Sequence, residues 1–390
     1  MDGVMLIPLF CATRSHCGSK AGTLGVLLHH GLPVPDGFVV PSTGEAAAGP
    51  ALHSAVAREL DLLGNPVLAV RSSAATEDTA DASAAGQYES VIGVQGVDAV
   101  CAAITACRAS AHAARVGDYR RRTNGHTADA AHGMAVLVQR VVEADVSGVL
   151  FTPTQPGDPI RVEASWGLGL AVVDGIVTPD TYEVAPDGKA TCTTGSKQIR
   201  IDLHTETAGV TTSAVADERQ TARTLDDRMA TVLAGLGNRI AGFLGGPQDI
   251  EWAVADGKVW ILQARPITAV PPAFAAPAPD IHTETLSGTP GSHGTVTATA
   301  RVVHGPADFV AVRPGEVVVC PYTDPAWTPL FTIATGVVTE TGGALSHAAI
   351  VAREYGIPAV LGVANATKRI ETGDPITLDG TAGSVTILPS

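Results

Sequence analysis

One string of this sequence joins a histidine to a glycine turn and a helix start. The residues before the histidine are small or carry hydroxyls: Thr341, Gly342, Gly343 and Ser346. Ser346 is a favoured N-cap type, and Gly356 and Pro358 are typical of a helix end, so the spacing predicts a helix that begins at about His347. The unpaired N–H groups at a helix N-terminus bind phosphate and disfavour a charged imidazole. This position would keep the His347 imidazole an uncharged nucleophile beside a phosphate-binding helix end. A capping or packing histidine is the alternative that these residues leave open.

Two basic residues occur in patterns that suit phosphate binding. Lys20 lies in the glycine-flanked segment 18–22. Arg71 directly follows a predicted strand at 67–70 and precedes two serines and a run of small residues. Small residues let the backbone approach a phosphate, and the guanidinium group donates several hydrogen bonds in a fork. Taken alone, the first string also fits a surface lysine and the second a flexible turn.

A third pattern is a predicted hairpin over residues 249–266. A two-residue loop at Asp256 would place Glu251 and Gln263 on opposite faces, whereas a three-residue loop would bring polar residues to one face. Under the second register the shared face carries two carboxylates, an amide and a guanidinium: Asp249, Glu251, Gln263 and Arg265. We favour the second register, because such a face would hold Mg²⁺ and polyphosphate together. A solvated polar face is the alternative.

The elements that must position these residues fall into two regions. Residues 1–268 alternate strand and helix patterns, whereas residues 284–390 show short strands, one good helix and many glycines. The predicted strands are 67–70, 134–142, 148–152 and 160–166, and the predicted helices are 99–115 and 221–243. The segment 269–283 between the regions is rich in proline and alanine, which favours an extended linker. It is either a passive spacer or a swivel. The predicted fold class is α/β (α+β).

These sequence motifs resemble those of the phosphoenolpyruvate-utilising enzymes, which include pyruvate phosphate dikinase and rifampin phosphotransferase. Residues 283–388 are similar to their swivelling β/β/α phosphohistidine domain, and residues 12–268 to their ATP-grasp nucleotide-binding domain. The resemblance implies that His347 is phosphorylated during turnover, with the loop of Thr341, Gly342, Gly343 and Ser346 around it.

The resemblance also implies roles in binding ATP and Mg²⁺. Lys20, Arg71 and Arg265 would contact the phosphates, and Glu251 and Gln263 would hold the metal with support from Asp249. Gln139 would border the adenine. Arg115 and Arg120 match an R-x4-R string of the family whose role is less defined.

The implied activity is that of a dikinase-type phosphotransferase. ATP would phosphorylate His347 with release of AMP and phosphate, and an acceptor, expected to be a small molecule, would then take the phosphoryl group. The printed sequence ends at Ser390, and we expect no dedicated acceptor-binding domain in it. Two alternatives stay open: a separate acceptor-binding subunit, and phosphorylation that activates a substrate for condensation or dehydration.

Charge and hydropathy narrow the function classes further. The net charge is −14, which argues against nucleic-acid or anionic-membrane partners. No apolar run reaches the roughly 18 residues that a membrane span needs. The first ten residues lack the basic segment of a secretory signal. We therefore expect a cytoplasmic protein with neither nucleic-acid nor membrane partners.

Overall fold

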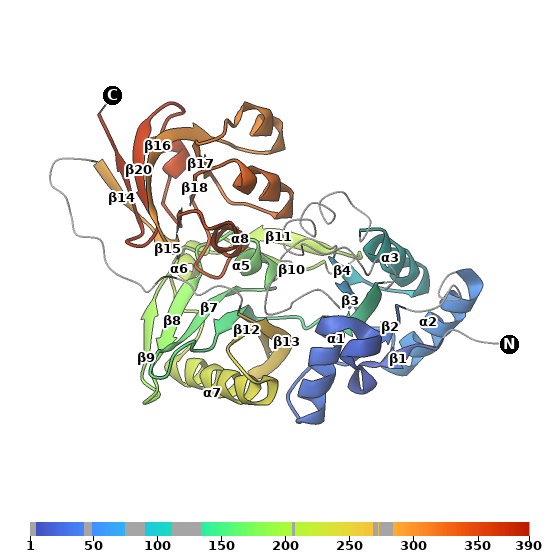
Figure 1. Cartoon of the computed structure of the whole chain (residues 1–390). Coiled ribbons are helices and arrows are strands. Elements are labelled where there is room, and N and C mark those ends of the chain that lie inside the picture. The colour runs from blue at the N-terminus through green and yellow to red at the C-terminus, as the bar shows by residue number, and fades with distance from the viewer. Residues whose placement is uncertain are drawn as a thin grey trace. The chain divides into compact units, whose positions relative to one another are not determined.

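The computed structural model describes residues 5–42, 49–74, 90–110, 134–204, 207–267, 272 and 284–389 (Figure 1). The chain divides into two compact units. The first contains Met1–Pro153, Ile201–Ser213 and Val232–Thr268, and the second contains Thr154–Arg200, Ala214–Thr231 and Ala269–Ser390. This spatial division differs from the sequence division at 269–283, because two stretches before the proline-rich segment pack with the C-terminal region.

A five-stranded antiparallel sheet organises the N-terminal part of the first unit. Its order is β1-β2-β5-β3-β4. The bounds are Ile7–Pro8, Gly37–Val40, Leu68–Ser73, Ser90–Val94 and Ala135–Arg140 for β1 to β5. One face packs on helices α2 (Gly49–Leu63) and α3 (Val97–Ser110), with Val70, Val138 and Ile104 in that core. Since side chains alternate along a strand, the opposite face carries Arg71 and Ser73.

The first unit also contains a long antiparallel hairpin. Strands β12 (Gln248–Ala255) and β13 (Lys258–Pro266) pair with each other, and β12 pairs with β6 (Val146–Phe151) on its other side. Helix α7 (Asp227–Leu244) packs Gly237 against Leu150 of β6. Helix α1 (Arg14–His29) contacts β3, β5 and β13, so it connects the five-stranded sheet to the hairpin. Strands β10 (Ile199–Leu203) and β11 (Val210–Ala214) form a separate pair.

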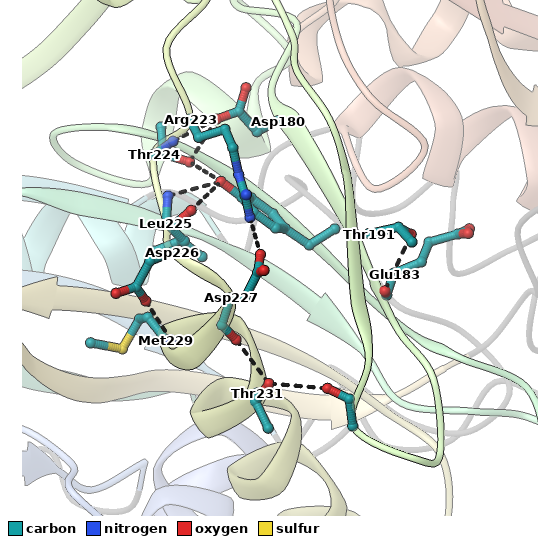
Figure 2. Close-up of polar contacts among 12 residues, drawn as sticks. Asp180, Glu183, Thr191, Arg223, Thr224, Leu225, Asp226, Asp227, Met229 and Thr231 are labelled. Atoms are coloured by element: carbon teal, nitrogen blue, oxygen red, sulfur yellow. Dashed lines mark hydrogen bonds and ion pairs between the residues drawn. The ribbon is translucent and has the colours of Figure 1, made fainter.

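The part of the second unit that precedes the proline-rich segment contains three antiparallel strands. They are β7 (Ile160–Trp166), β8 (Asp180–Val184) and β9 (Ala190–Thr193), with the short helices α5 (Leu170–Val173) and α6 (Asp217–Gln220). Figure 2 shows how β8 holds the segment before α7. Asp180 accepts hydrogen bonds from the N–H and hydroxyl of Thr224, and the N–H of Leu225 donates to the Tyr182 hydroxyl.

This network explains where α7 begins. The sequence predicts a helix from residue 221, but the helix starts at Asp227. The N–H groups of Thr224 and Leu225 bond side chains of β8 instead of helix carbonyls. Asp180 is fully buried and also pairs with the buried Lys197, so its carboxylate is compensated.

The C-terminal part of the second unit is built on an eight-stranded mixed sheet. Its order is β14-β21-β20-β16-β17-β18-β19-β15. The strands are Glu284–Ser287, Thr289–Ser292, Thr295–Val302, Val317–Cys320, Gly336–Thr339, Ala359–Leu361, Pro375–Asp379 and Ser384–Ile387 for β14 to β21. Strands β16 to β19 run parallel, and apolar clusters lie on both faces of them, as expected for a buried parallel core.

Two α-helices and two 3₁₀ segments accompany this sheet. They are α8 (His347–Tyr355), α9 (Ala366–Arg369), η2 (Pro306–Ala311) and η3 (Pro325–Thr332). Helix α8 packs on β15, β18, β19 and η3. The mixed α/β class predicted from the sequence is confirmed. The predicted strands at 67–70, 134–142, 148–152 and 160–166 correspond to β3, β5, β6 and β7.

Candidate functional site

A kink in helix α1 places Lys20 beside the end of strand β3. Gly18 has φ 76° and ψ 177°, which interrupts the helix one residue before Ser19. A Cβ on Gly18 would lie 1.9 Å from the carbonyl oxygen of Ser73, so only glycine permits this approach. The Ser73 hydroxyl donates to the carbonyl of Cys17 at 2.6 Å and accepts from the N–H of Ala21 at 3.1 Å.

Arg71 and Gln139 share one face of the five-stranded sheet. Arg71 pairs with Leu137 and Ala69 pairs with Gln139, so the four side chains point the same way. Gln139 is buried, and its side-chain amide donates to the carbonyl of Pro35 at 3.3 Å. This is the face that carries Ser73, so Arg71 and the Lys20 segment approach the same region of the first unit.

The hairpin brings its polar residues to one face, but not through the turn that the sequence analysis favoured. Asp256 and Gly257, with φ 51° and 71°, form a two-residue loop, so the prediction of a three-residue loop was wrong. A β-bulge then shifts the register: Glu251 pairs with Gln263, whereas Trp252 pairs with Ile261. The extra residue, Leu262, places Glu251 directly opposite Gln263.

The same register forms two ion pairs on that face. Asp249 lies opposite Arg265, and the Arg265 Nε donates to Asp249 Oδ2 at 2.8 Å. Arg71 Nη1 lies 3.5 Å from Glu251 Oε2, so the strand β3 arginine reaches the hairpin. The Asp249 side chain is 6% exposed and that of Glu251 is 23% exposed. Glu251 is therefore partly accessible to solvent, while Asp249 is nearly buried and paired with Arg265.

The donor set suits a hard cation that is shared with a phosphate chain. Within the described residues, no group of three or more His, Cys, Asp or Glu side chains is placed to hold a metal ion. Glu251 and Gln263 supply one carboxylate and one amide oxygen. Mg²⁺ is commonly bound by one or two carboxylates together with substrate phosphates, so this pair fits it. Arg115 lies outside the described residues, and so does Arg120.

In the second unit, His347 is the first residue of α8, as the sequence predicted. Ser346 is the N-cap with φ −77° and ψ 166°, and Gly356 ends the helix in the left-handed conformation with φ 66°. The Ser346 hydroxyl donates to the carbonyl of Gly343 at 2.9 Å rather than capping α8. This bond closes the glycine turn immediately before His347.

The His347 ring is buried and held from one side. It is 4% exposed, and its Nδ1 lies 3.0 Å from the hydroxyl of Thr323. Phe331 packs edge-on to the ring at 6.4 Å between centroids. Burial lowers the pKa of His347 to about 4, so the imidazole is neutral at pH 7. The neutral imidazole expected from the sequence therefore has burial as a cause, in addition to the helix N-terminus, which also disfavours a charged ring.

Two further residues were not recognised in the sequence as parts of the site. Thr323 orients the imidazole, and Glu163 of β7 accepts a hydrogen bond from the N–H of Leu345 at 3.2 Å. Both contacts join residues that are distant in the sequence, so neither contact is indicated by a local pattern. The loop also bonds the segment after α5, since Gly342 N–H donates to Val177 O at 3.0 Å.

The sequence of this chain matches those of known proteins. Residues 45–286 match the family model described as pyruvate phosphate dikinase, AMP/ATP-binding domain, and residues 312–383 match the PEP-utilising enzyme, mobile domain. The phosphoenolpyruvate synthase of Pyrococcus furiosus is 38% identical over 336 residues, and that of Escherichia coli is 36% identical over 341 residues. Both alignments cover 82% of this chain but only 40% and 43% of the relatives, so the chain spans less than half of their length.

Among solved structures, a D-alanine–D-alanine ligase from Bacillus anthracis with ATP aligns with 65% of this chain and 56% of that chain. The identity is 11% and the TM-score is 0.30, a likeness too slight to bear on function. Within the described residues, no helix is long and apolar enough to cross a membrane. The first family model covers more than half of the 390 residues. The chain belongs to the family of the pyruvate phosphate dikinase AMP/ATP-binding domain, and a PEP-utilising mobile domain follows that domain in the sequence.

Proposed function

We propose that this protein is an ATP-dependent phosphotransferase of the dikinase type, with His347 as its covalent phosphoryl carrier. The observation that carries the proposal is the state of His347: a buried, neutral imidazole at a helix N-terminus, with Nδ1 held by Thr323. When Nδ1 carries the proton and donates it to the Thr323 hydroxyl, the lone pair is on Nε2. Nε2 is then the nucleophile.

The proposed nucleotide site lies in the first unit. Lys20, Arg71 and Arg265 supply positive charge to the phosphates, and Gln139 borders the base. Glu251 and Gln263 hold Mg²⁺, which neutralises phosphate charge when it is bound. Asp249 fixes the Arg265 guanidinium through their 2.8 Å hydrogen bond. Arg71 is in turn held by Glu251, so cations and metal ligands share one supported face.

The proposed reaction consists of three group transfers. His347 Nε2 forms a bond to the β-phosphorus of ATP while the bond to the AMP oxygen breaks. A water molecule then takes the terminal phosphoryl group as inorganic phosphate, and the β-phosphoryl group stays on the histidine. An acceptor oxygen attacks this phosphorus, the N–P bond breaks, and the neutral imidazole is restored.

A small-molecule acceptor is proposed. Two relatives are named phosphoenolpyruvate synthase, which suggests a small carboxylic acid of the pyruvate type as one candidate to test. The acidic net charge of the chain gives no reason to propose a nucleic-acid acceptor. A cytoplasmic location is consistent with ATP as the donor.

The deciding experiment compares wild type with His347→Ala in the presence of ATP and Mg²⁺. We expect AMP formation in the wild type and none in the variant, while nucleotide binding survives because His347 is not among the proposed nucleotide contacts. Intact mass should show one added phosphate on wild type that is labile to acid and stable to base. His293→Ala, at an exposed histidine of the same region, is the matched control. AMP formation by His347→Ala at the wild-type rate would overturn the proposal.

A further inference from the structure

Glu163 is a fully buried carboxyl group that lies against the loop before His347. It is 0% exposed, and Oε2 accepts from Leu345 N–H at 3.2 Å. Oε1 has no hydrogen-bond partner among the residues that the structure describes. A Cβ on Gly343 would lie 2.3 Å from Oε2, so the glycine is what allows the loop to come this close.

Glu163 is one of several groups that hold the loop 341–346 in place, and we call this set of groups the seat of the loop. The Thr341 hydroxyl donates to the carbonyl of Gly175 at 2.6 Å, and Gly342 N–H donates to the carbonyl of Val177 at 3.0 Å. Both of these partners are backbone atoms. Glu163 is the side chain whose charge can change, so it is the member of the seat through which pH can act.

The cations near Glu163 are engaged elsewhere. Arg161, on the same strand, donates to Glu183 at 3.3 Å and to the carbonyl of Pro272 at 3.4 Å. Arg353, on α8, donates to the carbonyls of Gly291 and Ala344 at 2.7 and 2.8 Å.

Burial changes the pKa of Glu163 more than these cations do. Arg161 and Arg353 both lower the pKa of Glu163, as do the N–H groups of Ala344 and Leu345, but burial outweighs them and raises it to about 7. His347, the other titratable group of this loop region, is neutral because burial lowers its pKa to about 4.

We infer that Glu163 is a positioning residue that seats the loop 341–346 when it is protonated and weakens that seat when it is ionised. An ionised, incompletely paired carboxylate is costly when buried, so ionisation favours a state in which the loop lifts and water reaches Glu163. The role assigned to the loop rests on the proposed function of His347, but the seat itself does not.

The sign of the pH effect follows from linkage. The pKa of Glu163 is about 7 when the loop is seated, against an ordinary value of 4.5. Its contribution to seating is therefore fully present below about pH 4.5 and is lost as the pH rises through about 7. Between pH 6 and pH 8 the seating equilibrium constant should fall about tenfold.

The test is hydrogen–deuterium exchange of the 341–346 amides in the full chain without nucleotide, at pH 6 and pH 8, corrected for intrinsic exchange. We expect wild-type protection to fall about tenfold, and Glu163→Gln, which stays neutral, to remove most of that fall. Glu183→Gln, which changes the Arg161 partner and not the loop contact, should behave as wild type. His347 is present in all three proteins, so its own titration cancels in the comparison.

A second variant approaches the seat from the loop side. Gly343→Ala should lower protection at both pH values, since its Cβ would collide with Glu163. Wild-type pH dependence in Glu163→Gln, or wild-type protection in Gly343→Ala, would overturn the inference. AMP formation is measured on the same samples: its absence from wild type would refute the proposed function and leave the exchange result standing.

Discussion

Gly18→Ala should weaken nucleotide binding without touching any proposed ligand. The backbone at Gly18, with φ 76° and ψ 177°, lies in a region that is essentially restricted to glycine, and side chains there cost about 1–3 kcal/mol. The new Cβ would also lie 1.9 Å from Ser73 O, whereas ordinary contact begins at 3.4 Å. The segment must therefore move by about 1.5 Å, and it carries Lys20 with it.

The displacement sets the size of the expected effect. A misplacement of about 1 Å in a positioned group can cost on the order of 10²-fold in activity. Lys20 is one of several proposed cations, so we expect ATP affinity to fall about tenfold, or ~1.4 kcal/mol. The free energy of unfolding should also fall by about 3 kcal/mol, which is the sum of the backbone strain and the steric collision.

Gly31→Ala is the control that separates strain from collision. Gly31 follows α1, also has a positive φ of 68°, and has no atom within 4 Å of an added Cβ. It should lose only about 1–2 kcal/mol of stability and keep normal ATP affinity. Calorimetric titration with ATP and thermal unfolding on the same preparations provide both readouts. Equal ATP affinity in the two variants would refute the argument that the approach of Gly18 to Ser73 positions Lys20.

Two further predictions concern the hairpin and the linker. Glu251→Ala and Arg265→Ala should each abolish ATP-dependent AMP formation, and Arg265→Ala should also cost about 3 kcal/mol of stability because Asp249 loses its guanidinium partner in a nearly buried position. The double variant Asp249→Ala with Arg265→Ala should regain the lost stability but not ATP binding. Denaturant unfolding measures the stability and ATP titration measures the binding. Stability that stays low, or ATP binding that returns, would contradict this prediction. If the segment 269–283 is a swivel, deleting residues 271–279 should leave ATP binding near normal and cut phosphoryl transfer at least about tenfold, or ~1.4 kcal/mol in the barrier. Full transfer after the deletion would mean that the histidine region need not travel.

Local patterns were sufficient where the structure depends on neighbours in the sequence. The start of α8 at His347, its N-cap Ser346 and its left-handed end at Gly356 all follow from residue types within one helix length. The hairpin was also correctly located. Its register was not, because the bulge at Leu262 depends on how β13 fits its partner strand and no residue type marks it.

Contacts between residues that are far apart in the sequence could not be predicted from local sequence patterns. Thr323 and His347 are 24 positions apart, and Glu163 and Leu345 are 182 positions apart. Thr323 and Glu163 are ordinary polar residues in their own segments, and only tertiary packing gives each of them its partner. The start of α7 was misplaced for the same reason, since Asp180 and Tyr182 lie on a strand far from it in the sequence.

The proposed functional lysine and histidine are positioned by the same physical device. Gly18 precedes Lys20 by two residues and lies against Ser73, and Gly343 precedes His347 by four residues and lies against Glu163. In each case the absence of a Cβ lets the backbone approach a strand closely: the kink of helix α1 at Gly18 and the loop at Gly343. That approach fixes the backbone position near the functional side chain. The two seats differ in chemistry: Gly18 meets a carbonyl that carries no titratable charge, whereas Gly343 meets a carboxyl group whose pKa is about 7. The lysine segment should therefore be held equally at all pH values near neutrality, and the histidine loop should be held in a pH-dependent way.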